Sequence, residues 1–78
     1  MADEDFVMQP VVSSQIESVG YNPKTKELRV KFIKNGSLYS YSNVPSDVFV
    51  DLVYADSVGR YFAARVKNNS KYAYRRIG

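Results

Sequence analysis

The sequence ELRVKFIKNGSLYSYSNVP at residues 27–45 decides the fold of this chain. Charged and apolar residues alternate without a break over residues 27–32, and a period of two is typical of a strand with one buried face. Asn35 and Gly36 are the pair preferred in a type I′ turn between antiparallel strands. Residues 37–42 alternate again as the returning strand. The stretch therefore predicts a β-hairpin.

A two-residue loop would set the register of this hairpin. It would place Phe32 opposite Tyr39 and Val30 opposite Tyr41, so that both tyrosines lie on the apolar face. A slip of one residue would instead lay the tyrosines beside Arg29 and Lys31. We expect Tyr39 and Tyr41 to pack under helices in the core, and the alternative is that they form a base-stacking platform on the sheet.

The segment before the hairpin has a weaker strand pattern over residues 13–21. A type I turn at residues 22–25 joins it to the hairpin, and Gly20 is a candidate for a β-bulge. Residues 1–10 are acidic and lack sustained periodicity, so we expect a flexible lead there. The single folded domain is expected over residues 11–78.

The segment after the hairpin predicts two short helices. Pro45 is well placed to begin the first helix. Asp56 or Ser57 is the expected N-cap of the second helix, over residues 58–67. Residues 71–77 alternate again. The predicted fold is α+β: a three-stranded antiparallel β-meander with two short helices packed on one face and a C-terminal extended segment or edge strand.

Absent residue types exclude several kinds of chemistry. The 78 residues include no Cys and no His, so the chain has no disulfide framework and lacks the commonest general base and metal ligand. No apolar run approaches the ~18 residues of a membrane-spanning helix, and the acidic start lacks the positive region of a signal peptide. We expect a cytoplasmic protein without a metal or cofactor, and we interpret Asp3-Glu4-Asp5 as a solubilising tail.

Signals for catalysis are nearly absent. Asp47 and Asp51 lie four residues apart on one predicted helix face, but both are expected to be exposed to solvent, where a carboxylate is poorly suited to acid–base catalysis. Ser13 and Ser14 have no candidate base, and the chain has no glycine-rich loop that would hold a phosphate. The sequence therefore predicts a protein that is not an enzyme.

Positive charge is concentrated in two segments of a chain whose net charge is +3. Residues 24–34 hold five cations and one acid, and residues 57–78 hold six cations and no acid. If the two segments meet in the fold, they form the basic patch expected of a protein that contacts phosphates. The alternative interpretation is that the charge only serves solubility.

The candidate contact residues come from three places along the chain. Arg29 and Lys31 project from the strand face opposite the apolar residues, where a merely solvated face is the alternative. Arg65 and Lys67 lie at the end of the second helix. Residues 71–76 mix aromatic and basic side chains, although these tyrosines alternatively seal the sheet edge. The predicted nucleic-acid-binding residues are Arg29, Lys31, Arg65, Lys67, Lys71, Tyr72, Tyr74, Arg75 and Arg76.

Several short motifs resemble the KTSC family, over about residues 11–76. That family is named for the C-terminal extension of some lysyl-tRNA synthetases and also occurs as stand-alone proteins of bacteria and phages. The resemblance implies RNA binding. The motifs are Ser13-Ser14-x-Ile16, Val19-Gly20-Tyr21-x-Pro23, Gly36 with Tyr39-x-Tyr41, Val44-Pro45 and Ser57-x-Gly59-x-Tyr61-Phe62.

Charge and resemblance together predict a non-catalytic module that binds RNA or single-stranded nucleic acid through a basic, tyrosine-containing surface. The alternative is a protein–protein interaction module, such as a phage-encoded inhibitor of a host or defence protein, which would use an exposed sheet edge or the tyrosine-rich end of the chain. The sequence leaves the oligomeric state open.

Overall fold

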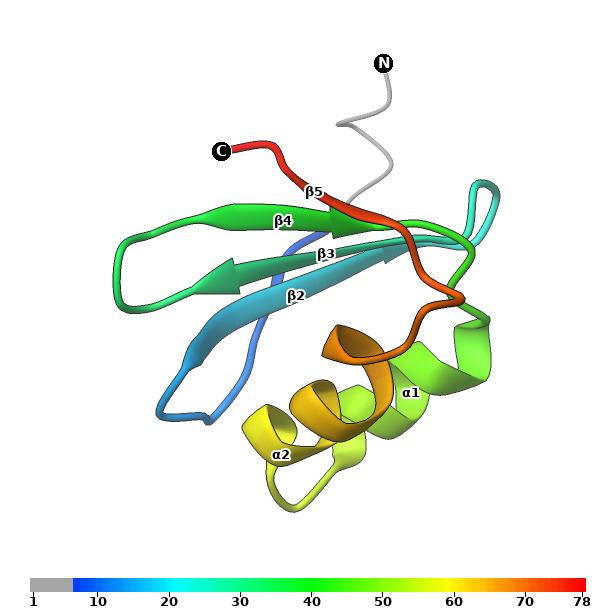
Figure 1. Cartoon of the computed structure of the whole chain (residues 1–78). Helices are drawn as coiled ribbons and strands as arrows, with labels where there is room; N and C mark the ends of the chain where they lie inside the picture. The colour runs from blue at the N-terminus through cyan, green and yellow to red at the C-terminus, as the bar shows by residue number, and fades with distance from the viewer. Residues whose placement is uncertain (1–6) are drawn as a thin grey trace.

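An antiparallel sheet of five strands, with the helices on one side of it, makes up the computed structural model, which describes residues 7–78 (Figure 1). Each strand pairs with the next one along the chain, so the strand order is β1-β2-β3-β4-β5. The elements are β1 (Gln9–Pro10), β2 (Ile16–Asn22), β3 (Glu27–Phe32), β4 (Leu38–Tyr41), α1 (Ser46–Tyr54), α2 (Val58–Phe62), the π-helical η2 (Ala63–Lys67) and β5 (Tyr74–Arg76).

The predicted α+β class is confirmed, but the sheet has five strands instead of three. β2, β3 and β4 form the predicted meander. β1 extends one edge, where Gln9 lies opposite Val19 and Pro10 lies opposite Ser18. β5 extends the other edge by pairing with β4. β5 is the edge strand that the alternation of residues 71–77 offered, limited to three residues, whereas β1 is only two residues long and carries little alternation that a sequence pattern would reveal.

The ordered part of the chain begins earlier than expected. β1 pairs with β2 ahead of Val11, where the folded domain was expected to start. Residues 1–6, which hold most of the expected flexible lead and the Asp3-Glu4-Asp5 cluster, lie outside the described residues.

The hairpin register is shifted by two residues from the prediction. Val30, rather than Phe32, lies opposite Tyr39, and Leu28 lies opposite Tyr41. Because side chains alternate with a period of two, an even shift leaves each of them on its predicted face. Tyr41 is 4% exposed and Tyr39 is half-buried against the core. Their assignment to the core is therefore confirmed for Tyr41 and holds in part for Tyr39.

The cause of the shift is a loop of four residues, so the predicted two-residue type I′ turn is wrong. The Phe32 N–H donates to the Ser37 carbonyl over 2.9 Å, and the Gly36 N–H donates to the Phe32 carbonyl over 3.1 Å. Gly36 has a φ of +68°, but Asn35 does not have the positive φ that a type I′ turn requires there. The Asn35 side-chain oxygen instead accepts a hydrogen bond from the Ser37 N–H over 3.1 Å.

A β-bulge interrupts β2, though not at the predicted Gly20. Gly20 pairs regularly with Arg29, and the register shift lies between Ile16 and Ser18. The extra residue breaks the alternation, so that Ile16 and Val19 are both fully buried although they are three positions apart. The bulge explains why the sequence of this segment reads as a weak strand.

The helices follow the predicted pattern closely. α1 begins directly after Pro45, and Ser57 is the N-cap of α2, where its Oγ accepts a hydrogen bond from the Arg60 N–H over 3.4 Å. α2 and η2 together span the predicted residues 58–67. The buried core joins the helices to the sheet through Ile16, Val19, Leu28, Val30, Tyr41, Val44, Leu52, Val58, Phe62 and Val66.

Within residues 7–78, no helix is long and apolar enough to cross a membrane. The same residues contain no group of three or more acidic side chains that could hold a metal ion.

Candidate nucleic-acid interface

A hollow of about 520 Å³ lies between the β3–β4 hairpin, β5 and the helical layer. We call it the aromatic hollow, because the hydrophobic residues that line it are all aromatic. Lys34 and Lys67 are the charged residues of its described lining, and the polar ones include Asn35, Ser37 and Asn68. A planar, anionic ligand would meet favourable chemistry here. The aromatic residues of the lining are Phe32, Tyr39, Tyr41, Phe62 and Tyr74.

Antiparallel pairing positions the tyrosines of the aromatic hollow. Tyr74 on β5 lies opposite Tyr41 on β4, and directly opposed residues share a face of the sheet. Their rings stack, with centroids 5.8 Å apart and planes 29° apart. Tyr74 also lies 6.3 Å from Tyr39 in a tilted arrangement. Because Tyr74 remains 65% exposed, much of its surface is open to a further planar group.

Phe62 of α2 packs against two of the aromatic rings that line the hollow. Its ring meets Tyr41 edge-on at a centroid distance of 5.4 Å and meets Phe32 edge-on at 5.6 Å. Phe62 is 3% exposed, so it belongs to the core and to the floor of the aromatic hollow together. The exposed tyrosine is therefore held by packed rings instead of extending from a free tail.

Burial keeps the hydroxyl of Tyr41 protonated. It raises the pKa of Tyr41 to about 12, and the neighbouring hydroxyls of Tyr39 and Tyr74 act in the same direction. The Tyr41 hydroxyl therefore keeps its proton at neutral pH and is a hydrogen-bond donor there.

The raised pKa of Tyr41 predicts a loss of stability at alkaline pH. The contribution of Tyr41 is fully present below the unfolded pKa of about 10 and is lost as the pH rises through the folded value of about 12. We expect the free energy of unfolding to fall over this window, and to fall less in Tyr41→Phe. Urea unfolding followed across the window measures this. Tyr54→Phe, on the exposed side of α1, is the matched control, and an equal change in both variants would contradict the assignment.

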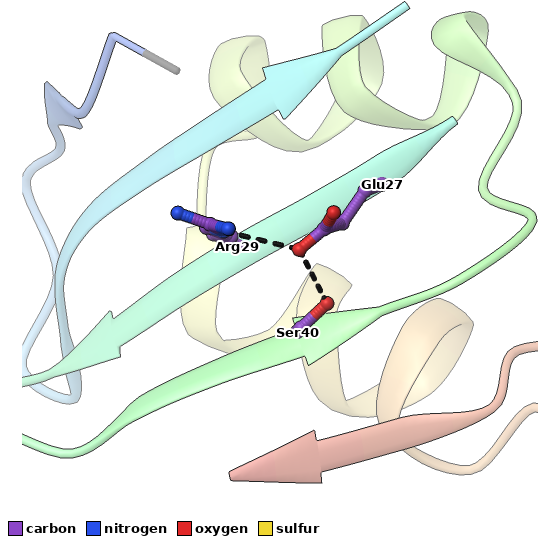
Figure 2. Close-up of polar contacts among 3 residues, drawn as sticks. All are labelled: Glu27, Arg29 and Ser40. Carbon is purple, nitrogen blue, oxygen red and sulfur yellow. Dashed lines mark hydrogen bonds and ion pairs between the residues drawn. The ribbon is translucent and has the colours of Figure 1, made fainter. Parts of the chain in front are cut away.

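The predicted residues Arg29 and Lys31 lie on the sheet face away from the helices, and acids neutralise both. The Glu27 carboxylate accepts hydrogen bonds from Arg29 Nε over 3.0 Å and from Ser40 Oγ over 2.7 Å (Figure 2). Lys31 Nζ lies 3.4 Å from a Glu17 carboxylate oxygen. Ser40, on the same face of the sheet, is only 5% exposed.

Glu27 is ionised in this network. Burial opposes its ionisation, but the hydrogen bonds from Ser40 and Arg29 and the positive charges of Arg29 and Arg75 outweigh burial and lower the pKa of Glu27. Arg75 lies opposite Ser40 and so projects on this face of the sheet. The three cations of this face therefore balance acids at least in part, and they make a weaker phosphate site than the sequence predicted.

The nine predicted residues do not form one patch. Tyr74 and Lys67 line the aromatic hollow, and Arg76 lies opposite Tyr39 on the same face of the sheet, with its Nε donating to the Gly78 carbonyl over 3.0 Å. Tyr72 is half-buried against the core. The remaining members are separated from the hollow by the sheet or lie exposed on η2 and the loop that follows it: Arg29, Lys31 and Arg75 on the far face, and Arg65 and Lys71 on the helical side.

Lys34 is the cation of the aromatic hollow that the predicted set omitted. It lies in the four-residue loop between β3 and β4, where strand alternation does not apply, so no strand pattern could have identified it. Tyr39 and Tyr41 were expected in the core, with a base-stacking platform as the alternative. In the structure they also line the hollow, because Tyr74 on β5 extends the tyrosine layer beyond β4.

Ser13 and Gly59, from two of the sequence motifs, lie where the residues before β2 meet the start of α2. Ser13 Oγ accepts hydrogen bonds from the N–H groups of Gln15 and Ile16, over 3.1 and 3.2 Å. A Cβ added at Gly59 would lie 3.3 Å from Gln15 Oε1 and 3.4 Å from Ser13 Oγ. Gly59 therefore allows the residues before β2 to approach the start of α2.

Enlarging Gly59 is expected to separate these two segments. The branched side chain of Gly59→Val would press on the side chains of Ser13 and Gln15, so we expect a loss of about 1–3 kcal/mol in the free energy of unfolding. Gly59→Ala is the matched variant. Its single Cβ meets the flexible end of Gln15, and Ala favours a helix, so we expect it to remain within about 1 kcal/mol of the parent. Equal urea midpoints for the two variants would contradict the close approach.

Sequence comparisons place the chain among known proteins. The KTSC domain family matches residues 12–74. The chain is 47% identical over 60 residues to a protein of Tsukamurella paurometabola, a match that covers 77% of this chain and 88% of that protein. It is 43% identical over 65 residues to a protein of Stutzerimonas stutzeri, with 83% and 89% covered.

The fold is similar to a solved structure. The crystal structure of a KTSC domain protein from Yersinia pestis has 37% sequence identity and a TM-score of 0.85, and the match covers 94% of this chain and 99% of that one. Sheet, helices and core thus define a small α+β domain of known type. The chain belongs to the KTSC domain family, which confirms the resemblance seen in its motifs.

Proposed function

We propose that this KTSC domain is a non-catalytic module that binds RNA or single-stranded nucleic acid at the aromatic hollow. One observation carries the proposal: Tyr74 is 65% exposed and stacks on Tyr41 at the rim of a hollow whose charged lining residues, within the described chain, are lysines. Proteins bind unpaired bases by this combination of an exposed aromatic ring and nearby cations.

The roles of the side chains follow from their chemistry. An unpaired base stacks on Tyr74, because every base has a flat π-face. Lys34 and Lys67 attract the adjoining phosphates, and Arg76 adds a further cation on the same face of the sheet. A duplex keeps its bases stacked on one another, so it cannot use the tyrosine in this way. We therefore propose a preference for single strands over duplex.

A titration at several salt concentrations tests the proposal. Fluorescence anisotropy with short single-stranded RNA, single-stranded DNA and duplex DNA measures the affinity of the full chain. We expect single strands to bind more tightly than duplex, with an affinity that falls as salt rises, by a slope of roughly −0.7 for each phosphate contacted. Absence of binding at low salt, from protein shown to be folded, would refute the proposal.

Removing the two lysines is expected to reduce the salt dependence. Lys34→Ala/Lys67→Ala should lower the magnitude of the slope by roughly 0.7 for each lysine that contacts a phosphate. The matched control is Lys24→Ala/Arg60→Ala, which removes the same charge from exposed positions that do not line the aromatic hollow. If both double variants change the slope equally, the binding responds to net charge and the hollow is not the site.

A further inference from the structure

The strand β5 leaves one edge of the sheet open (Figure 1). The Ser42 N–H donates to the Ala73 carbonyl over 2.8 Å, and the Ile77 N–H donates to the Leu38 carbonyl over 2.8 Å. In an antiparallel pair, alternate residues turn their backbone groups toward the partner strand. Residues 73, 75 and 77 therefore face β4, and the N–H and C=O groups of Tyr74 and Arg76 point outward.

The outward groups form a short edge that a further strand can use. Tyr74, Arg75 and Arg76 are all exposed, and no strand of the described chain lies beyond them. An unpaired edge offers its N–H and C=O groups to an added strand, and peptides are commonly recognised by such addition.

Charge determines which strand fits this edge. Arg76 projects on the face of the aromatic hollow, and Arg75 projects on the opposite face, so an added strand meets a guanidinium on either side. Lys71 is exposed nearby in the chain, and residues 57–78 hold no acid. A second copy paired here would bring like charges together, which disfavours self-association. An acidic strand would gain ion pairs instead.

We propose that the open edge of β5 binds an extended acidic peptide segment of a protein partner, as an additional antiparallel or parallel strand. The outward N–H and C=O groups of Tyr74 and Arg76 pair with its backbone. Acidic side chains of the segment pair with Arg75 and Arg76, and an apolar one packs beside Tyr74. The proposed nucleic-acid site uses none of these backbone groups, so this inference goes beyond it.

Two substitutions at one position separate the backbone bond from the charge. Arg76→Ala removes the guanidinium and keeps the outward N–H, whereas Arg76→Pro removes both. Proline is tolerated on an edge strand where its nitrogen faces solvent. The probe is a short fluorescein-labelled peptide of alternating Glu and Val, titrated against the full chain by anisotropy. We expect Arg76→Pro to bind the peptide about two- to tenfold more weakly than Arg76→Ala, because the proline variant lacks one backbone hydrogen bond to the peptide.

The controls distinguish the possible outcomes. The same peptide with an N-methyl group on every residue loses its own donors and should bind more weakly to the unmodified chain, which tests the edge even if Arg76→Pro fails to fold. A Lys–Val peptide should not bind. Equal affinity of the two Arg76 variants together with full binding of the N-methylated peptide would overturn the proposal. So would absence of binding by the Glu–Val peptide, or a dimer of the chain that Arg76→Pro abolishes.

Discussion

Replacing Phe62 with Ala is expected to lower the free energy of unfolding by about 3–5 kcal/mol. Phe62 is 3% exposed, and its ring contacts Phe32 and Tyr41 edge-on at centroid distances of 5.6 and 5.4 Å. Removing the ring leaves a cavity between the helices and the sheet, in addition to losing the burial of the ring itself. Domains of this kind have total stabilities of about 5–15 kcal/mol, so the variant should be close to unfolding.

Urea unfolding followed by circular dichroism measures the effect of this change. Phe62→Leu is the matched control, because it keeps most of the buried volume and should cost less than about 1.5 kcal/mol. Loss of the ring should also disturb the aromatic hollow, since Phe62 lies under Tyr41. If Phe62→Ala unfolds at the same urea concentration as Phe62→Leu, the ring does not fill the core as described.

The hairpin shows why an incorrect register still gave the correct faces. The prediction paired Phe32 with Tyr39, and the structure pairs Val30 with Tyr39. The loop length changed by two residues, and two is the period of a strand, so the burial of Tyr41 was predictable from the alternation alone. The loop type was not, because Asn35 satisfies the Ser37 N–H through its side chain and does not adopt a positive φ.

The second helix was predictable in more detail because its signals are local. Ser57 caps it and residues 58–67 form it, as their spacing indicates. The C-terminal edge strand offered by the alternation of residues 71–77 forms as β5, whereas β1 depends on contacts with distant residues. β1 is only two residues long and contains Pro10. No pattern in residues 9–10 therefore predicts its pairing with β2.

The candidate site was predictable by residue type but not by arrangement. Residue type identified Tyr74 and Lys67, which line the aromatic hollow. It also identified Arg29, whose partner Glu27 lies two residues away on the same strand face and binds it over 3.0 Å. A count of charges treats such an arginine as available, although the i, i+2 spacing already placed an acid beside it. Positive charge along the chain therefore overstated the basic surface of the sheet.

Tyr74→Ala is expected to weaken the binding of single-stranded RNA or DNA by about tenfold, because loss of a stacking ring costs about 1–3 kcal/mol for each base. Tyr74 is 65% exposed, so the domain should remain folded, which its urea midpoint would show. Tyr54→Ala is the matched control. Tyr54 is 82% exposed on α1 and does not line the aromatic hollow, so its removal should leave the affinity unchanged.

A third variant separates the ring of Tyr74 from its hydroxyl. Tyr74→Phe keeps the flat face that stacks on Tyr41, with centroids 5.8 Å apart in the parent, and should therefore keep most of the affinity. Anisotropy titrations of all three variants against the same single strand measure this. If Tyr74→Phe binds as weakly as Tyr74→Ala, the contact is a hydrogen bond of the hydroxyl and no base stacks there. If Tyr54→Ala loses as much affinity as Tyr74→Ala, the strand binds outside the aromatic hollow.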